Sequence, residues 1–175
     1  MTGRAGLGVA NRRNEAGFTL IEMLTVLTIG AVLAMVAAPF LTNAGLNGTL
    51  TASANNLASA VNIARTEAVK RNATITLCMS SDGSTCAASG NWAQGWIVKN
   101  GTTVVHYQAA APTGFKISDS GSATTISFPP YGLLSASYTF TICRQTPSVG
   151  KQERVVYVTT TGQLRVKTTS NASCP

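Results

Sequence analysis

The fold of this chain is decided by residues 17–41, which read G-F-T-L-I-E-M-L-T-V-L-T-I-G-A-V-L-A-M-V-A-A-P-F-L. From Phe18 to Leu41 the run holds 24 residues, and Glu22 is its sole ionisable side chain. As a helix rising about 1.5 Å per residue, it reaches about 36 Å, enough to cross a bilayer core of about 30 Å. The sequence therefore predicts a membrane-spanning helix at 18–41.

The residues before this run form a short leader of small and basic side chains. A secretory signal places its small-residue cleavage site behind the apolar stretch. Here the small residues come first, and no site of the Ala-x-Ala kind follows the apolar run cleanly. Arg12 and Arg13 flank the N-terminal end of the run, which the positive-inside rule keeps in the cytoplasm. We expect the helix to stay as an anchor, with residues 42–175 on the far side of the membrane.

The junction Gly17-Phe18-Thr19-Leu20-Ile21-Glu22 resembles the prepilin peptidase site of type IV pilins and type II secretion pseudopilins. The resemblance implies a leader at 1–17, cleavage between Gly17 and Phe18, and N-methylation of the new Phe18 amine. Glu22 would be the fifth mature residue, the one that this family uses for registry in assembly. Pro39 would be the twenty-second, and it should kink or interrupt the helix because it lacks a backbone donor.

The position of Glu22 also has a physical interpretation. A carboxylate at the centre of a bilayer costs about 2.5–3.5 kcal/mol on insertion scales, so it needs a partner. The free amine of Phe18, on the same chain or on a neighbour, is one candidate. The alternative is a carboxylate that snorkels to the cytoplasmic interface.

The length, charge and cysteine content of the chain indicate what kind of domain follows the apolar run. A chain of 175 residues suits one domain with its own core. The net charge is +7, and residues 42–175 carry ten basic and four acidic side chains, a net +6. Such a head attracts polyanions, or is merely soluble. Four cysteines behind a membrane anchor predict two disulfides in an oxidising compartment rather than a zinc site.

The head shows one helical pattern followed by short β patterns. Residues 43–48 are small and polar and predict a loosened stretch. An apolar face then recurs at spacings of three and four, at Leu50, Ala54, Leu57, Val61, Ala64 and Ala68. Strands are expected near 73–80, 94–99, 102–108, 114–118, 123–128, 138–144, 153–160 and 163–167. The Asp82-Gly83 turn would bring Cys78 and Cys86 together.

Two segments of the head resemble the GspH/FimT-type minor pilins. They are residues 64–71, A-R-T-E-A-V-K-R, and the tryptophans Trp92 and Trp96 around Gly95 at a strand entry. The resemblance implies an α+β pilin fold, in which one long N-terminal helix packs by its second half on antiparallel sheets. It also implies a Cys143–Cys174 disulfide that ties down the C-terminus. Core packing is the preferred interpretation of both indole rings, ahead of ligand stacking.

Catalysis is not indicated by any constellation in the sequence. His106 lies within an apolar strand pattern, and the acidic residues of the head form no spaced pair. Neither a nucleophile elbow nor a phosphate-binding loop is present. We therefore expect no catalytic residue, no metal and no cofactor, and a chain that is a substrate of prepilin peptidase rather than an enzyme.

A second possible function concerns DNA. FimT-type competence pilins bind DNA through a Gly-Arg-x-Arg segment, and the matching residues here are Gly162-Gln163-Leu164-Arg165, with glutamine in place of the first arginine. In a strand, Gln163, Arg165 and Lys167 share one face, and Leu164 and Val166 would face the core. The candidate contacts to double-stranded DNA are Gln163, Arg165, Lys167, Arg154, Lys151 and Arg144. The alternative is a solvated strand face.

Three hypotheses follow. The first is a minor type IV pilin that initiates or caps a filament and contacts other major and minor pilins, the inner membrane and prepilin peptidase. The second is a DNA-binding minor pilin for natural transformation. The third is a minor pseudopilin of a type II secretion system. In each, the chain starts as a single-pass inner-membrane protein with a periplasmic head and then enters a filament.

Overall fold

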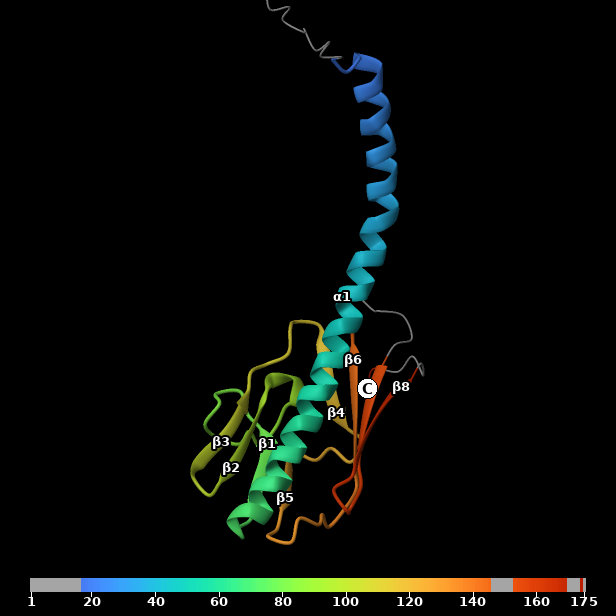
Figure 1. Cartoon of the computed structure of the whole chain (residues 1–175). Helices are drawn as coiled ribbons and strands as arrows, with labels where there is room; N and C mark the ends of the chain where they lie inside the picture. The colour runs from blue at the N-terminus through green and yellow to red at the C-terminus, as the bar shows by residue number, and fades with distance from the viewer. Residues whose placement is uncertain (1–16, 146–152, 170–173, 175) are drawn as a thin grey trace, which may run out of the picture. The chain divides into compact units, whose positions relative to one another are not determined.

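The computed structural model describes residues 17–145, 153–169 and 174. It contains one long helix followed by eight strands and a single turn of 3-10 helix (Figure 1). The chain divides into two compact units between Leu41 and Thr42. The elements are α1 (Leu20–Arg71), β1 (Ile75–Met79), η1 (Trp92–Gln94), β2 (Trp96–Asn100), β3 (Thr103–Gln108), β4 (Phe115–Asp119), β5 (Thr125–Phe128), β6 (Tyr138–Arg144), β7 (Glu153–Val158) and β8 (Leu164–Thr169).

The helix α1 is assigned without a break, which makes the predicted loosened stretch at 43–48 wrong. Pro39 lies within α1 and does not interrupt it. Two hydroxyl groups in this region donate to backbone carbonyls one turn earlier, Thr49 Oγ1 to Gly45 O and Thr51 Oγ1 to Asn47 O. Small polar residues are weak helix formers. Their low intrinsic propensity is overridden here because the segment is continuous with helix on both sides.

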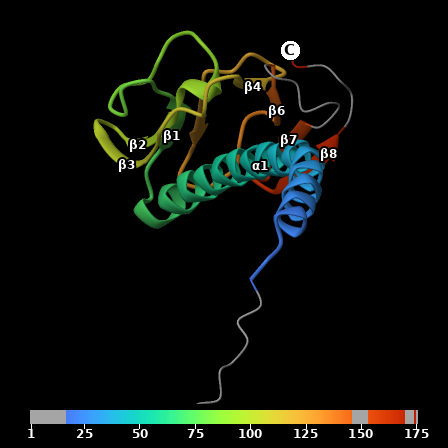
Figure 2. The same ribbon diagram turned by 90° about the horizontal axis from the view of Figure 1, so that it is seen from above.

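Two antiparallel four-stranded sheets complete the head. One sheet has the order β3-β2-β1-β5, and the other has the order β4-β6-β7-β8. All eight strands correspond to the predicted ones, and the α+β pilin fold is confirmed. Figure 2 shows the second half of α1 lying across the strands of the head.

The core of the head lies between α1 and both sheets. All six residues of the predicted apolar face of α1 are completely buried. They join one continuous cluster with residues of both sheets, such as Leu77 and Phe140. Trp92 and Trp96 are also buried, as core packing predicts. The Trp92 ring meets Phe140 edge-on at 5.1 Å, and its Nε1 donates to the Ala123 carbonyl at 2.8 Å.

Both pairs of cysteines are joined as the sequence suggested. Cys78 bonds to Cys86 across a loop in which Gly83 has a φ of +73°. The Asp82 carboxylate organises this loop by accepting from the Thr85 hydroxyl and from the backbone N–H groups of Thr85 and Ser84. These bonds, the Thr85 hydroxyl first, lower the pKa of Asp82 well below its ordinary value. The second disulfide ties Cys174 to Cys143 in β6.

Candidate functional site

The first site lies at the start of α1, where Thr19 caps the helix. The Thr19 N–H and the Thr19 hydroxyl both donate to Glu22 Oε2, each at 3.0 Å. In return, the Glu22 N–H donates to Thr19 Oγ1 at 3.3 Å. This reciprocal pattern is a capping box, and it holds the carboxylate at the positive end of the helix dipole. Glu22 is therefore positioned by its own chain before any other subunit is present.

Thr19 was not among the predicted site residues, although its spacing to Glu22 carries the signal. A threonine followed three residues later by glutamate, ahead of an apolar run, is the usual mark of a capping box. The partner predicted for Glu22 was the Phe18 amine, which comes into existence when the Gly17–Phe18 bond is cut. Gly17 and Phe18 precede the helix in non-helical backbone, and both are exposed.

The apolar part of α1 presents its side chains outward. Leu20–Ala38 is long and apolar enough to cross a membrane, with a mean hydropathy of 2.3, and none of it is buried. Two hydroxyls inside it are satisfied locally, because Thr25 Oγ1 donates to Glu22 O and Thr28 Oγ1 to Thr25 O, both at 2.8 Å. The surface that remains is hydrocarbon, which suits lipid tails or the helices of other subunits.

The second candidate site, the basic set on the last strands, divides between two faces of its sheet. Arg165 and Lys167 pair with Tyr157 and Val155, and they lie on the face away from α1. Lys167 Nζ is 5.8 Å from the centre of the Tyr157 ring. Arg154 lies on the opposite face, because its Nε donates to Thr51 Oγ1 of α1 at 3.2 Å.

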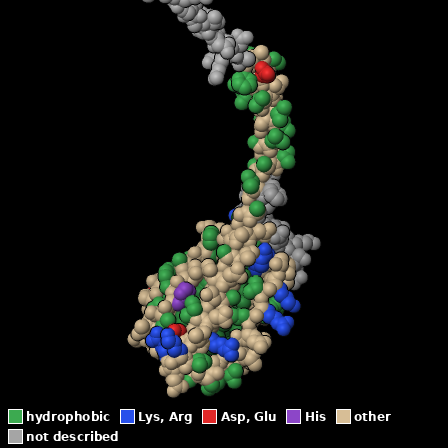
Figure 3. Space-filling model, viewed as in Figure 1, with side chains coloured by type: hydrophobic (Ala, Val, Ile, Leu, Met, Phe, Trp, Pro, Cys, Tyr) green, Lys and Arg blue, Asp and Glu red, His purple; other side chains and the backbone are tan. Residues whose placement is uncertain are grey.

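The remaining members of that set do not complete a single surface. Arg144 is on the α1 side of β6, over the ring of Phe115 at 5.4 Å. Gln163 precedes β8 in a turn, and Lys151 lies outside the described residues. On the face shown in Figure 3, Lys and Arg likewise occupy several separate places. Arg165 and Lys167 therefore share one face of the sheet, Arg154 and Arg144 share the other, and the predicted residues that the structure describes form no single surface.

The strand β8 follows the predicted alternation, because Leu164 and Val166 pair with the core residues Val158 and Val156 of β7. Leu164 packs partly on the core, but Val166 is 41% exposed although it lies on the same side. The reason is that β8 is the last strand of its sheet. An edge strand can extend beyond the helix that covers its neighbours, and basic residues such as Arg165 and Lys167 discourage pairing of that edge with other chains.

The other chemically active residues have structural roles. Asp119 is buried and accepts from the N–H groups of Gly121, Ala123 and Thr139. Burial, with the Asp119 charge, raises the pKa of Tyr138. Across residues 17–145, 153–169 and 174, no three His, Cys, Asp or Glu side chains gather as metal ligands. In the described part of the chain, the role of Asp119 is to stabilise loops by accepting backbone hydrogen bonds.

A further residue, for which the sequence predicted no role, joins α1 to two turns. Arg65 lies against Gly132 and Gly162, which have φ values of +69° and +74°. Its Nη1 donates to the Gly162 carbonyl at 3.5 Å, across 97 positions of sequence. This contact fixes the end of α1 against the β5–β6 connection and the β7–β8 turn.

Comparison with known families gives two matches. Residues 53–162 match the family described as type II transport protein GspH. Residues 12–38 match the prokaryotic N-terminal methylation motif. No curated protein sequence matched the chain.

Among solved structures, the type IV minor pilin FimU of Pseudomonas aeruginosa is similar, with a TM-score of 0.56 at 19% identity. That match covers 72% of this chain and 95% of the FimU chain. The minor pseudopilin EpsH of Vibrio cholerae gives a TM-score of 0.46 at 14% identity, covering 68% of this chain and 96% of EpsH.

Proposed function

We propose that this chain, which belongs to the GspH family of type II transport proteins, is a minor type IV pilin that initiates or caps a filament. One observation carries the proposal. An apolar helix with every described side chain exposed begins directly behind Gly17–Phe18 and continues into a disulfide-linked head. Such a helix is stable in a membrane or in a bundle of similar helices. Assembly therefore consists of moving the apolar first part of α1, Leu20–Ala38, from lipid into a helical bundle.

The capping box supports a specific role for Glu22 in that transfer. While the chain is in the membrane, Thr19 supplies hydrogen bonds to the carboxylate and lowers the cost of placing it there. Cleavage creates the Phe18 amine, which the methylation motif marks for N-methylation. The methylated amine keeps its positive charge, and a neighbouring subunit's Glu22-equivalent carboxylate pairs with it. That exchange sets the register between subunits.

Processing at Gly17 is tested by a single substitution. In cells that assemble the filament, Gly17→Leu should leave the leader attached, because a bulky side chain blocks the cleavage site. Intact mass would then show the chain with its 17 leader residues, and filaments would lack it. Gly30→Leu is the matched control for cleavage, because it adds the same side chain away from the cleaved bond and a Cβ at Gly30 meets nothing of its own chain within 4 Å. Normal cleavage and assembly of the Gly17→Leu chain would contradict the proposal.

The Glu22 role is tested separately from cleavage. Glu22→Gln removes the charge and keeps the shape, so the chain should be cut normally but should enter filaments poorly. Thr19→Val removes the capping hydroxyl and should reduce the amount of chain that inserts stably. The measurement is the ratio of membrane-bound to filament-bound chain on an immunoblot. A Glu22→Gln chain that enters filaments at the normal level would rule out the registry role.

The family's description favours a second candidate, a minor pseudopilin of a type II secretion system, with the same fold and the same processing. Genomic neighbours and a deletion distinguish the two. Deletion should abolish filaments and leave protein secretion intact if the chain is a pilin. The opposite result identifies the pseudopilin.

Double-stranded DNA is a third candidate, favoured by the exposed pair Arg165 and Lys167 on a head of net charge +6. Phosphate contacts make affinity fall with salt, and removing one phosphate-binding cation reduces the slope of that dependence by about one. A gel-shift titration of the head with double-stranded DNA should show this for Arg165→Ala and Lys167→Ala. Lys99→Ala, on the other sheet, is the control. Unchanged affinity in both variants would exclude this surface.

A further inference from the structure

The end of the head at which α1 stops has an exposed apolar surface. Val69 is 55% exposed, Tyr131 is 71% exposed and Leu133 is 47% exposed. Gly132 packs its backbone directly on the helix, since a Cβ there would lie 3.0 Å from Val69 Cγ2. We call these apolar residues and the adjacent Lys70 the α1-end surface. Clustered, exposed apolar side chains on a soluble head mark a contact site.

The α1-end surface is held in a fixed conformation. The Gly132 N–H donates to the Pro129 carbonyl at 2.8 Å, and the Leu134 N–H donates to the Thr160 carbonyl at 2.8 Å. Leu134 is buried in the core, next to the exposed Leu133. A surface that is ordered before binding loses little entropy when a partner arrives. Tyrosine is also among the residues that contribute most to protein interfaces.

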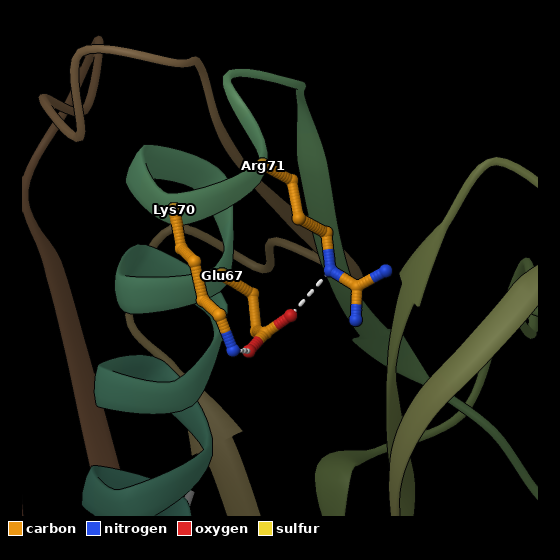
Figure 4. Close-up of polar contacts among 3 residues, drawn as sticks. All are labelled: Glu67, Lys70 and Arg71. Carbon is orange, nitrogen blue, oxygen red and sulfur yellow. Dashed lines mark hydrogen bonds and ion pairs between the residues drawn. The ribbon is translucent and has the colours of Figure 1, made fainter.

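A shallow, open hollow between side chains on the exposed side of α1 borders this surface, and its lining includes Arg65, Val69 and Lys70. Lys70 is 73% exposed and only 3.8 Å from Glu67 Oε1, while Glu67 also accepts from Arg71 Nε (Figure 4). The terminal nitrogens of Arg71 point away from Glu67 in Figure 4. The local charge is therefore positive, two cations against one shared carboxylate.

The charges on the rest of the head restrict the kind of protein that can bind the α1-end surface. All nine Lys and Arg residues in the described part of the head are at least partly exposed. Of its four acidic residues, Asp119 and Glu153 are buried, Glu67 is engaged by two cations, and Asp82 is saturated by hydrogen bonds within its loop. Two copies of this head would therefore present basic surfaces to each other, and like charges in contact suppress pairing.

We infer that the α1-end surface binds the head of a different pilin subunit, one with more acidic than basic residues and an apolar contact at its centre. This rests on the proposed function. Apolar residues favour a protein over a nucleic acid, and the positive rim selects an acidic partner. The chain is consequently incorporated next to unlike subunits and does not polymerise with itself.

A photo-crosslinking experiment with the full chain tests this, in cells that assemble the filament. Tyr131 is replaced by p-benzoylphenylalanine, and the adduct formed on irradiation is identified by mass spectrometry. We expect a single adduct with another processed prepilin whose head is acidic. Lys70→Glu should lower its yield about fivefold, as expected for a rim charge. Lys99→Glu, on β2, should not. Tyr107, half exposed on β3, is the matched position for the crosslinker.

The outcomes separate the surface from the function. An adduct with a second copy, with a basic-headed subunit or with DNA overturns the inference. So does an equal adduct from Tyr107, or no Tyr131 adduct in a chain that does enter filaments. In each of these cases the proposed function stands. A chain that is never processed and never enters filaments overturns the proposed function and this inference with it.

Discussion

The two disulfides close loops of very different length, and this predicts how much each stabilises the head. Cys78 and Cys86 are 8 positions apart, whereas Cys143 and Cys174 are 31 apart. A crosslink mainly restricts the unfolded chain, by an amount that grows with the logarithm of loop length. With that relation, the short loop contributes about 2.5 kcal/mol at 25 °C and the long loop about 3.7 kcal/mol. Removing the second pair should therefore cost more.

The measurement is urea unfolding of the head, residues 42–175, at neutral pH. Replacing both cysteines of a pair by alanine avoids a free thiol that exchanges with the other pair. The fluorescence of Trp92 and Trp96 reports unfolding, because both rings are buried in the folded head. We expect the Cys143/Cys174 variant to unfold at lower urea than the Cys78/Cys86 variant. The reverse order, or equal midpoints, would refute the loop-length argument.

Three further predictions concern the head. Leu57→Ala empties a fully buried position and should cost about 2–5 kcal/mol in urea unfolding, whereas exposed Ser59→Ala should change stability by less than about 0.5 kcal/mol. Because the pKa of Asp82 is lowered from its ordinary value of 3.8, the ionised carboxylate stabilises the folded head at pH values above 3.8. That stabilisation is lost progressively as the pH falls below 3.8. Asp82→Asn should therefore show a smaller fall in urea midpoint between pH 6 and pH 2.5. Gly162→Ala combines a left-handed backbone with a close side chain and should lower the thermal midpoint more than Gly101→Ala, which has the left-handed backbone alone.

The sequence predicted the strands and the core well because both depend on local periodicity. The six apolar positions of α1 recur at helical spacing, and all are buried. The continuity of α1 was missed because propensity alone treats small polar residues as a break. Gly45 and Gly48 lie within α1, and a Cβ added at either position would meet nothing within 4 Å. No close packing within the chain therefore requires glycine at these two positions.

The basic set could not be placed from sequence, because alternation fixes faces only within one strand. Which face of β7 aligns with which face of β8 depends on register, and this register puts Arg154 and Arg165 on opposite sides. The exposure of Val166 depends on β8 being an edge strand, and strand order is not encoded locally. The contact of Arg65 with Gly162 spans 97 positions and leaves no local signal.

The central claim is tested most directly by the N-terminus and location of the mature chain. Intact-mass measurement and N-terminal sequencing of the chain recovered from cells should show N-methylated Phe18 as the first residue. In the proposed topology the head lies outside the inner membrane, so protease added to spheroplasts should digest it. A mature chain that begins anywhere else, or a head protected in the cytoplasm, would contradict the account.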